Sequence, residues 1–128
     1  MTSTFLRRTS NIYHSQKRRA KAAGIQIDYT LDGLRDIIQA AMGEPCPYCG
    51  EVLKPSNISV DHRTPTSRTG PHTIANTVVC CEACNQRKGP LTEEEYTEML
   101  ALILEWPQPA RQSVLTRLRA GGKFIHQN

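Results

Sequence analysis

Five cysteines carry the strongest chemical signal of the sequence. Cys46 and Cys49 form one C-x-x-C pair, and Cys81 and Cys84 form a second. Two thiolates separated by two residues can take adjacent corners of a tetrahedron, and a second pair completes a four-sulfur site, so we predict a structural Zn²⁺ ion. Buried reduced thiols or a disulfide pair are the alternatives. Cys80 has the wrong spacing to Cys84, and we assign it to the core.

Polar residues with metal-binding and proton-transfer chemistry lie between and beside these pairs. Asp61 and His62 end an alternating run that predicts a strand over 57–62, which places their side chains on opposite faces. Residues 63–75, rich in Pro, Thr, Ser and Gly, predict a loop. Residues 76–80 predict a second strand, and 84–88 predict a short helix ended by Gly89 and Pro90.

The order of these residues identifies a family resemblance. Asp61-His62, then Asn76 before an apolar strand, then the run from Cys84 to Gly89, together resemble an HNH endonuclease with the ββα-metal fold and a four-cysteine zinc site. The likeness covers Cys46 to about Pro90. A further likeness, to the segment that precedes the first cysteines in small phage-type members, rests on Arg18-Arg19-Ala20-Lys21 followed by Gly24-Ile25 and a helix.

The resemblance implies a metal-dependent DNA endonuclease that hydrolyses phosphodiester bonds. In-line attack by water requires a base to activate the water and a cation to stabilise the phosphate and leaving-group charge. By resemblance, His62 is the general base, Asp61 and Asn85 hold the cation, and Asn76 orients His62 by bonding backbone near the strand end. The ordinary pKa of histidine, about 6.5, suits a base near pH 7. The products should carry 5′-phosphate and 3′-hydroxyl ends.

Asn85 departs from the pattern that gives the family its name, because many members carry their last histidine at this position. An amide oxygen together with a carboxylate oxygen is a hard ligand set, which favours Mg²⁺ or Mn²⁺. We therefore predict two metals, a structural Zn²⁺ and a catalytic Mg²⁺ or Mn²⁺.

Basic residues gather at the start of the chain, although the net charge is only +4. Six lysines and arginines precede Asp28, with no acid among them, and 10–23 is compatible with a helix. This predicts phosphate contacts. A disordered arm or a solvated helix face is the alternative. The predicted DNA contacts are Lys17, Arg18, Arg19, Lys21, Arg63, Arg87 and Lys88.

The elements that position these residues predict one compact α+β domain, with the ββα-metal core and its zinc site flanked by N-terminal and C-terminal helices. We expect a basic segment and packing helix over 1–45, the nuclease core over 46–90 and a helical extension over 91–128. A helix over 31–42 presents an apolar stripe to the core. Thr92 and Glu95 form a capping box, and a last helix over 110–120 should end at Gly121 and Gly122.

Two other functions fit parts of this pattern. A non-catalytic zinc-stabilised module would bind nucleic acid through the basic N-terminal segment, but it would not need Asp61, His62 and Asn85 together. An interaction subunit of a packaging machine would use the apolar face of the helix over 93–105. Five acids in that helix make its other face a poor surface for DNA, so we expect DNA to approach elsewhere.

The composition also bounds the setting. A hydrophobic fraction of 38% with two Phe and one Trp allows only a modest core, which a zinc cross-link would help to hold. No apolar run is long enough to span a bilayer and the start lacks a signal peptide's apolar core, so we expect no membrane association. We expect a monomer in a reducing cytoplasm, that of a bacterial host if a phage or prophage encodes the chain. His14, His72 and His126 are not expected in the site.

Overall fold

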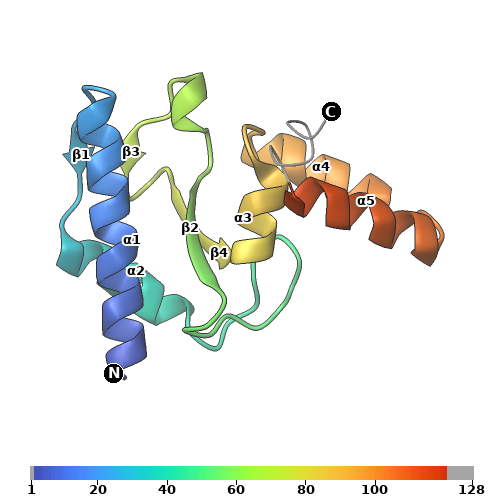
Figure 1. The fold of residues 1–128 in the computed structure, drawn as a ribbon, viewed down its shortest axis with the longest axis horizontal. Helices are drawn as coiled ribbons and strands as arrows, with labels where there is room; N and C mark the ends of the chain where they lie inside the picture. The colour runs from blue at the N-terminus through green and yellow to red at the C-terminus, as the bar shows by residue number, and fades with distance from the viewer. Residues whose placement is uncertain (1, 121–128) are drawn as a thin grey trace.

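The computed structural model describes residues 2–120. The elements in chain order are α1 (Ser3–Ala22), β1 (Ile27–Asp28), α2 (Leu31–Ala41), β2 (Ile58–His62), the 3-10 turn η1 (Thr66–Arg68), β3 (His72–Thr73), β4 (Thr77–Cys81), α3 (Glu82–Lys88), α4 (Glu93–Ile103) and α5 (Gln108–Ala120) (Figure 1). Gly121, Gly122 and His126 lie outside the described residues. Within those residues, no helix is long and apolar enough to cross a membrane.

A β-hairpin followed directly by a helix forms the centre of the molecule. β2 and β4 pair antiparallel, with Ile58 opposite Cys81 and His62 opposite Thr77. α3 begins at Glu82, two residues earlier than the sequence indicated, because the Cys81 side chain caps it and accepts from the backbone N–H of Cys84. The α+β class is confirmed, and so is the prediction of two longer strands followed by a short helix.

Helix α1 is longer than the sequence indicated, since it begins at Ser3 and not near Ser10. The Thr2 hydroxyl accepts from the backbone N–H of Phe5 and caps the helix. The Phe5 side chain is buried in the core, which holds this first turn against the body. The N-terminal segment therefore packs against the domain. Its basic residues lie on a helix and not on a disordered arm.

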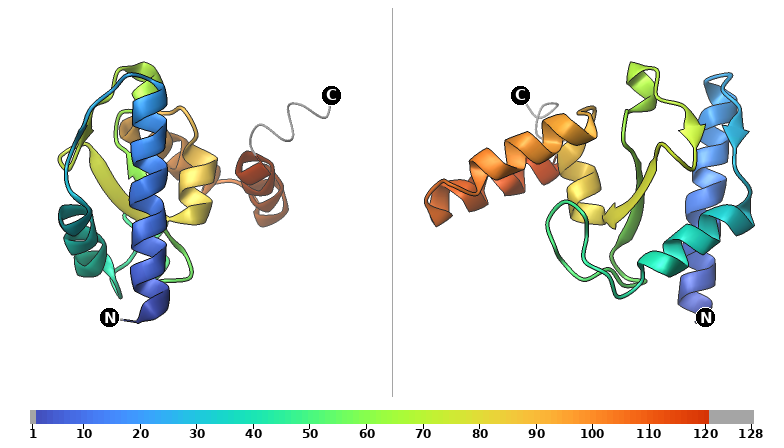
Figure 2. Two further views of the ribbon diagram at one scale, coloured as in Figure 1. Left: turned by 60° about the vertical axis from the view of Figure 1, so that its left-hand side comes forward. Right: turned by 180° about the vertical axis from the view of Figure 1, so that it is seen from behind.

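Helix α2 contributes buried apolar side chains to the core. The Thr30 side chain accepts from the N–H of Gly33 and caps the helix, as expected for a residue of this type. Leu34 and Ile38, one helical turn apart, are fully buried and belong to the same apolar cluster as Ile58 of β2. Helices α1 and α2 lie together on one side of the hairpin (Figure 2).

Helices α4 and α5 lie on the other side of α3 from α1 (Figures 1 and 2). The predicted capping box of α4 is present, because Thr92 and Glu95 each accept from the other's backbone N–H. Tyr96 follows and is fully buried. α5 begins at Gln108, two residues earlier than expected, which places Pro109 within the first turn, where a missing N–H costs no helical hydrogen bond.

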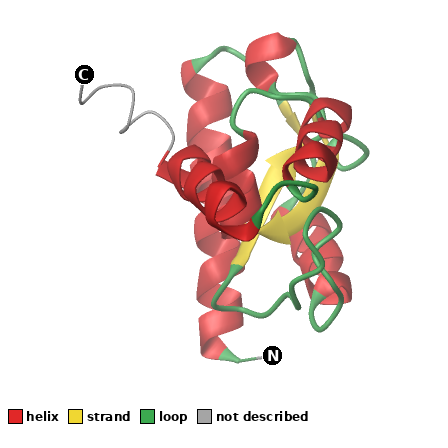
Figure 3. Ribbon diagram, turned by 90° about the vertical axis from the view of Figure 1, so that its right-hand side faces the viewer, coloured by secondary structure: helices red, strands yellow, loops and turns green. Residues whose placement is uncertain are grey.

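The segment between β2 and β4 is more ordered than the predicted loop. β3 pairs in parallel with β1, with Ile27 next to His72 and Asp28 next to Thr73. The prediction that His72 is a loop residue is therefore corrected: it lies in a short strand and is buried. A partner that is 45 residues earlier in the chain sets this position, so local sequence pattern does not reveal it. Figure 3 shows the loops that join these short strands.

Gly70 gives a test of this connection. A Cβ at this position would collide with the backbone carbonyl of Thr64 and lie 2.9 Å from that of Pro65. We expect Gly70→Ala to destabilise the fold by about 1–3 kcal/mol, as other overpacking substitutions do. Ser67→Ala, at an exposed position of the same segment, is the control. Urea unfolding measures both, and equal midpoints for the two variants would contradict the packing described here.

Candidate active site and metal centre

The four cysteines of the two C-x-x-C pairs form one cluster. The Sγ atoms of Cys46, Cys49, Cys81 and Cys84 all lie within 4.8 Å of one another. The sulfurs of Cys49 and Cys81 are 3.7 Å apart. Tetrahedral zinc with Zn–S bonds of about 2.3 Å separates its sulfurs by roughly 3.8 Å. The donor set therefore fits a structural zinc ion. Cys80 is fully buried in the core and lies outside the cluster, as expected.

The surroundings of the four cysteine sulfurs favour the binding of a cation. Burial, with a smaller effect from the neighbouring Cys46 sulfur, raises the pKa of Cys81 to about 11. Backbone N–H groups point at the sulfurs, since the N–H of Cys81 donates to Cys46 and that of Cys84 to Cys81, both at 3.4 Å. A bound dication would replace the thiol protons, so metal binding would release protons and stabilise the fold.

Helix α3 lies against β2 in a fixed register. The N–H of Glu82 donates to the carbonyl of Asn57 at 2.8 Å. One turn later, Nδ2 of Asn85 donates to Oγ of Ser59 at 2.6 Å. Because helix residues three apart and strand residues two apart recur on one face, each turn of α3 meets the next residue on one face of the strand. The next step of this register is the pair formed by Lys88 and Asp61.

Lys88 and Asp61 form a buried ion pair. Nζ of Lys88 lies 3.0 Å from Oδ2 of Asp61 and donates to the backbone carbonyl of His62 at 2.9 Å. The Tyr48 hydroxyl also donates to Oδ2 of Asp61, at 3.3 Å. Burial raises the pKa of Asp61, and Lys88 opposes that shift. Lys88 is 0% exposed, so this side chain, predicted to contact DNA, is directed into the protein.

His62 is half-buried at the end of β2. Its ring lies 4.7 Å from that of His72, edge to face. Burial, the neighbouring His72 and the positive charges of Lys88 and Arg19 together lower the pKa of His62 to about 4, and burial has the largest effect. The imidazole is therefore neutral near pH 7. Its Nε2 is buried and has no hydrogen-bond partner among the described residues.

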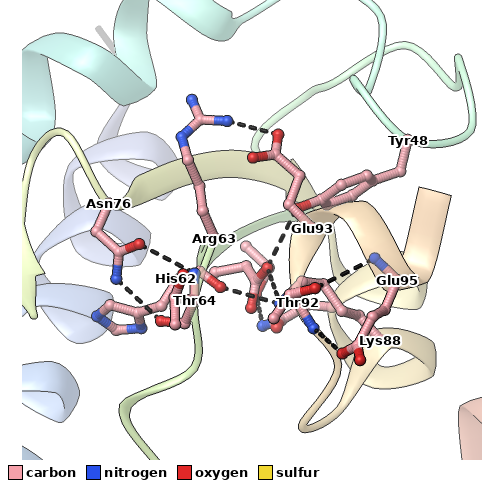
Figure 4. A network of polar contacts seen from close by, with 12 residues as sticks. Tyr48, His62, Arg63, Thr64, Asn76, Lys88, Thr92, Glu93 and Glu95 are labelled. Atoms are coloured by element: carbon pink, nitrogen blue, oxygen red, sulfur yellow. Dashed lines mark hydrogen bonds and ion pairs between the residues drawn. The ribbon is translucent and has the colours of Figure 1, made fainter. Parts of the chain in front are cut away.

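Asn76 holds the backbone that follows His62. Its Oδ1 accepts from the N–H of Thr64 and its Nδ2 donates to the carbonyl of Thr64, both at 3.0 Å (Figure 4). Nδ2 also donates to the carbonyl of Pro71 at 2.9 Å. Three hydrogen bonds to main chain fix the turn two residues after the histidine. Asn76 contacts this backbone and makes no hydrogen bond to the imidazole itself.

Asp61, His62 and Asn85 line one groove, which we call the central groove. It has a volume of about 300 Å³ and lies between α1, β2 and the start of the loop after β2. Gln16 and Arg19 of α1 form its opposite wall. The carboxylate of Asp61, the amide of Asn85, the neutral imidazole of His62 and the guanidinium of Arg19 thus line the same groove. This arrangement can bind a divalent cation together with an anionic ligand and can accept a proton.

The remaining predicted DNA contacts fall into two groups. Lys17, Arg18, Arg19 and Lys21 are all exposed on α1, and Arg19 also lines the central groove. Arg63, in contrast, is in an ion pair with Glu93 at 2.6 Å and donates to the carbonyl of Ala75. Arg87 is half-buried on α3. The four basic residues of α1 are therefore more accessible to phosphate than Arg63 and Arg87 are.

The sequence reasoning missed four residues of this site: Gln16, Tyr48, Ser59 and His72. Ser59 had a local signal, because it lies two residues before Asp61 and so on the same face of the strand. Tyr48 lies inside the first C-x-x-C pair, where only the folded cluster shows that it reaches Asp61. Gln16 and His72 come to the site through long-range packing that no local pattern reveals.

A β-hairpin and helix joined by a four-cysteine cluster define a zinc-type ββα module, flanked here by helices on both sides. Residues 46–101 match the family model described as HNH endonuclease. This segment, which is somewhat less than half of the chain, is similar to HNH endonucleases. The similarity suggests nuclease activity. No curated protein matched the chain.

The cluster makes a testable distinction among the five cysteines. We expect the purified protein to carry one Zn²⁺ per chain, and Cys84→Ser to lose it and unfold at a lower temperature, because a structural zinc site needs all four ligands. Cys80→Ala is the matched control and should keep its zinc. Elemental analysis and thermal unfolding measure both properties. Retention of zinc by Cys84→Ser, or its loss from Cys80→Ala, would contradict the assignment.

Proposed function

We propose that this protein is a DNA endonuclease that hydrolyses phosphodiester bonds, with His62 as general base and one Mg²⁺ or Mn²⁺ held by Asp61 and Asn85. The observation that carries the proposal is the presence of these three side chains in one groove, on the hairpin and helix of a segment similar to HNH endonucleases. The bound cation would stabilise the negative charge that develops on the phosphate and the leaving oxygen.

The contacts of Asn85 support its role as a ligand. Its Nδ2 donates to Ser59 at 2.6 Å, which fixes the amide plane and leaves Oδ1 as the atom available to a cation. Neutral amide oxygens are suitable ligands for hard cations. Ser59 thereby acts as a positioning residue for Asn85.

Asp61 is held in a similar way. Lys88 and Tyr48 both contact Oδ2, while Oδ1 takes part in neither contact. The carboxylate is thus oriented by one oxygen and can offer the other to a cation in the groove. The positive charge of Lys88 favours the ionised carboxylate, which is the form that binds metal.

His62 is the base that the proposal requires. A ring nitrogen of the neutral imidazole would take a proton from the attacking water. Asn76 fixes the backbone that follows the histidine, and His72 packs against its ring, so the imidazole has little freedom to turn away. Preorganisation of this kind lowers the cost of reaching the reactive geometry. The products would carry 5′-phosphate and 3′-hydroxyl ends.

DNA would approach over α1. Lys17, Arg18, Arg19 and Lys21 are exposed there, and Arg19 reaches the central groove. The acidic helix α4 lies on the opposite side of α3 (Figure 1). Arg63 and Arg87 are further candidates for phosphate contact, whereas buried Lys88 contacts Asp61 and the backbone of His62 instead.

Cleavage of supercoiled plasmid by zinc-loaded protein tests the function. We expect nicking or linearisation with Mg²⁺ or Mn²⁺, and a loss of about 10²–10⁴-fold in rate for His62→Ala, because that is what a positioned general base contributes. His14→Ala, at an exposed histidine that lines no groove, should cleave at the normal rate. DNA binding by His62→Ala should survive.

Equal loss of cleavage and of binding in a folded His62→Ala protein would refute the base assignment. No cleavage with either metal, from folded zinc-bound protein that still binds DNA, would favour a non-catalytic nucleic-acid-binding module.

The charge of α1 predicts a salt dependence. Arg19→Gln should lower the slope of log affinity against log salt by about 0.9, the value for one lost contact with a duplex phosphate. Lys54→Gln removes the same charge from an exposed position outside α1 and should leave the slope unchanged. Titrations of a labelled duplex at several salt concentrations measure both. The same slope for both variants would place DNA elsewhere.

A further inference from the structure

A second groove lies beside the central groove, and we call it the α1 groove. It has a volume of about 230 Å³ and runs between α1 and the elements β2 and α3. The residues that matter here are Arg8, Asn11, Ser15 and Arg19 of α1, Ser59 of β2 and Asn85 of α3. It is smaller than most pockets for drug-sized ligands, which have volumes of ~300–1,000 Å³. A part of a longer molecule fits such a space better than a free ligand does.

The two grooves are adjacent. Gln16, Arg19, Val60 and Asn85 line both of them. A linear molecule bound in the central groove can therefore extend along α1 to the neighbouring α1 groove. Asn85, the proposed metal ligand, stands at this junction, so whatever occupies the α1 groove lies next to the reacting phosphate.

The charges along the α1 groove suit a nucleic-acid strand. No carboxylate is among its lining residues, and an arginine stands towards each end. Arg8 is anchored there, since its Nη2 donates to the carbonyl of Ile58 at 3.0 Å and lies 3.5 Å from a carboxylate oxygen of Glu82. Arg8 and Arg19 are eleven helical residues apart, which corresponds to about 16 Å along the axis. At 3.4 Å per nucleotide, this is about five nucleotides of duplex.

Between the two arginines the groove offers neutral hydrogen-bonding groups. The side chains of Asn11 and Ser15 lie one turn apart on α1, and among the described residues neither makes a hydrogen bond. An amide and a hydroxyl without partners can donate to and accept from base edges or sugars, which phosphate-binding arginines cannot read. The α1 groove thus has a positive charge near each end and neutral polar side chains between them.

We propose that the α1 groove binds the nucleotides that flank the cleaved bond, with phosphates near Arg8 and Arg19 and a base or sugar edge at Asn11 and Ser15. The proposal rests on the nuclease function proposed above for the location of the cut. It assigns a binding site to a face of α1 that is distinct from the one carrying Lys17 and Lys21.

Binding by an inactive protein tests the site without depending on cleavage. In a His62→Ala background, we expect the double variant Asn11→Ala/Ser15→Ala to bind a labelled duplex about tenfold more weakly, as expected for the loss of two ordinary hydrogen bonds. Alanine favours helix, so α1 should be preserved. Gln39→Ala, an exposed amide on α2 that lines neither groove, is the control and should bind normally.

Cross-linking locates the bound strand. With a photoreactive benzoyl-phenylalanine at position 11, we expect cross-links within about five nucleotides of the cut site, the length that the groove spans. The same group at position 39 should give none. Normal binding by the double variant, or cross-links no stronger than those from position 39, would overturn the proposal even if the plasmid is cut. Weakened binding and strong cross-links with an uncut plasmid would support the groove as a DNA site and refute the nuclease function instead.

Discussion

The register of α3 on β2 is the constraint on which the site depends. Three successive contacts join the two elements, from the backbone of Glu82, the amide of Asn85 and the ammonium of Lys88. The last contact is a buried ion pair, and such pairs often contribute little net stability because both charges lose their hydration. Removing one partner, however, leaves an uncompensated buried charge, so the pair strongly disfavours any other register. In this structure, that specificity fixes Asp61 of the strand and Asn85 of the helix in one groove, next to His62.

The cysteine cluster secures the same junction from the other end. Cys81 is the last residue of β4, the cap of α3 and a member of the cluster, so one side chain joins strand, helix and metal centre. Tyr48, between the first two cysteines, extends this connection to Oδ2 of Asp61 and packs edge to face on the buried Tyr96. Tyr48 thus connects the cysteine cluster to the candidate active site. A small domain with a modest core needs such a cross-link, and here it also supports the proposed site directly.

Much of the local structure could be predicted from the sequence, because its signals are local. The C-x-x-C spacing predicted the cluster, alternation predicted β2, and Thr92 with Glu95 predicted the start of α4. Features determined by distant partners were not predictable. Lys88 has the composition of a solvated helix end, yet Asp61, which lies 27 residues earlier, draws it into the interior. His72 lies in a polar loop by composition, and only its pairing with β1 brings its ring against His62.

The proposed site offers a cation few ligands from the protein, and this has a consequence for how metal and substrate bind. Asp61 and Asn85 would each contribute one oxygen, since Oδ2 of Asp61 contacts Lys88 and Tyr48 and Nδ2 of Asn85 donates to Ser59. Mg²⁺ is six-coordinate and commonly completes its shell with water and substrate phosphates. The cation and the DNA would therefore each increase the affinity of the other by the same factor. Arg19 in the same groove adds a contact for phosphate but none for metal, so it would strengthen DNA binding whether or not the cation is present.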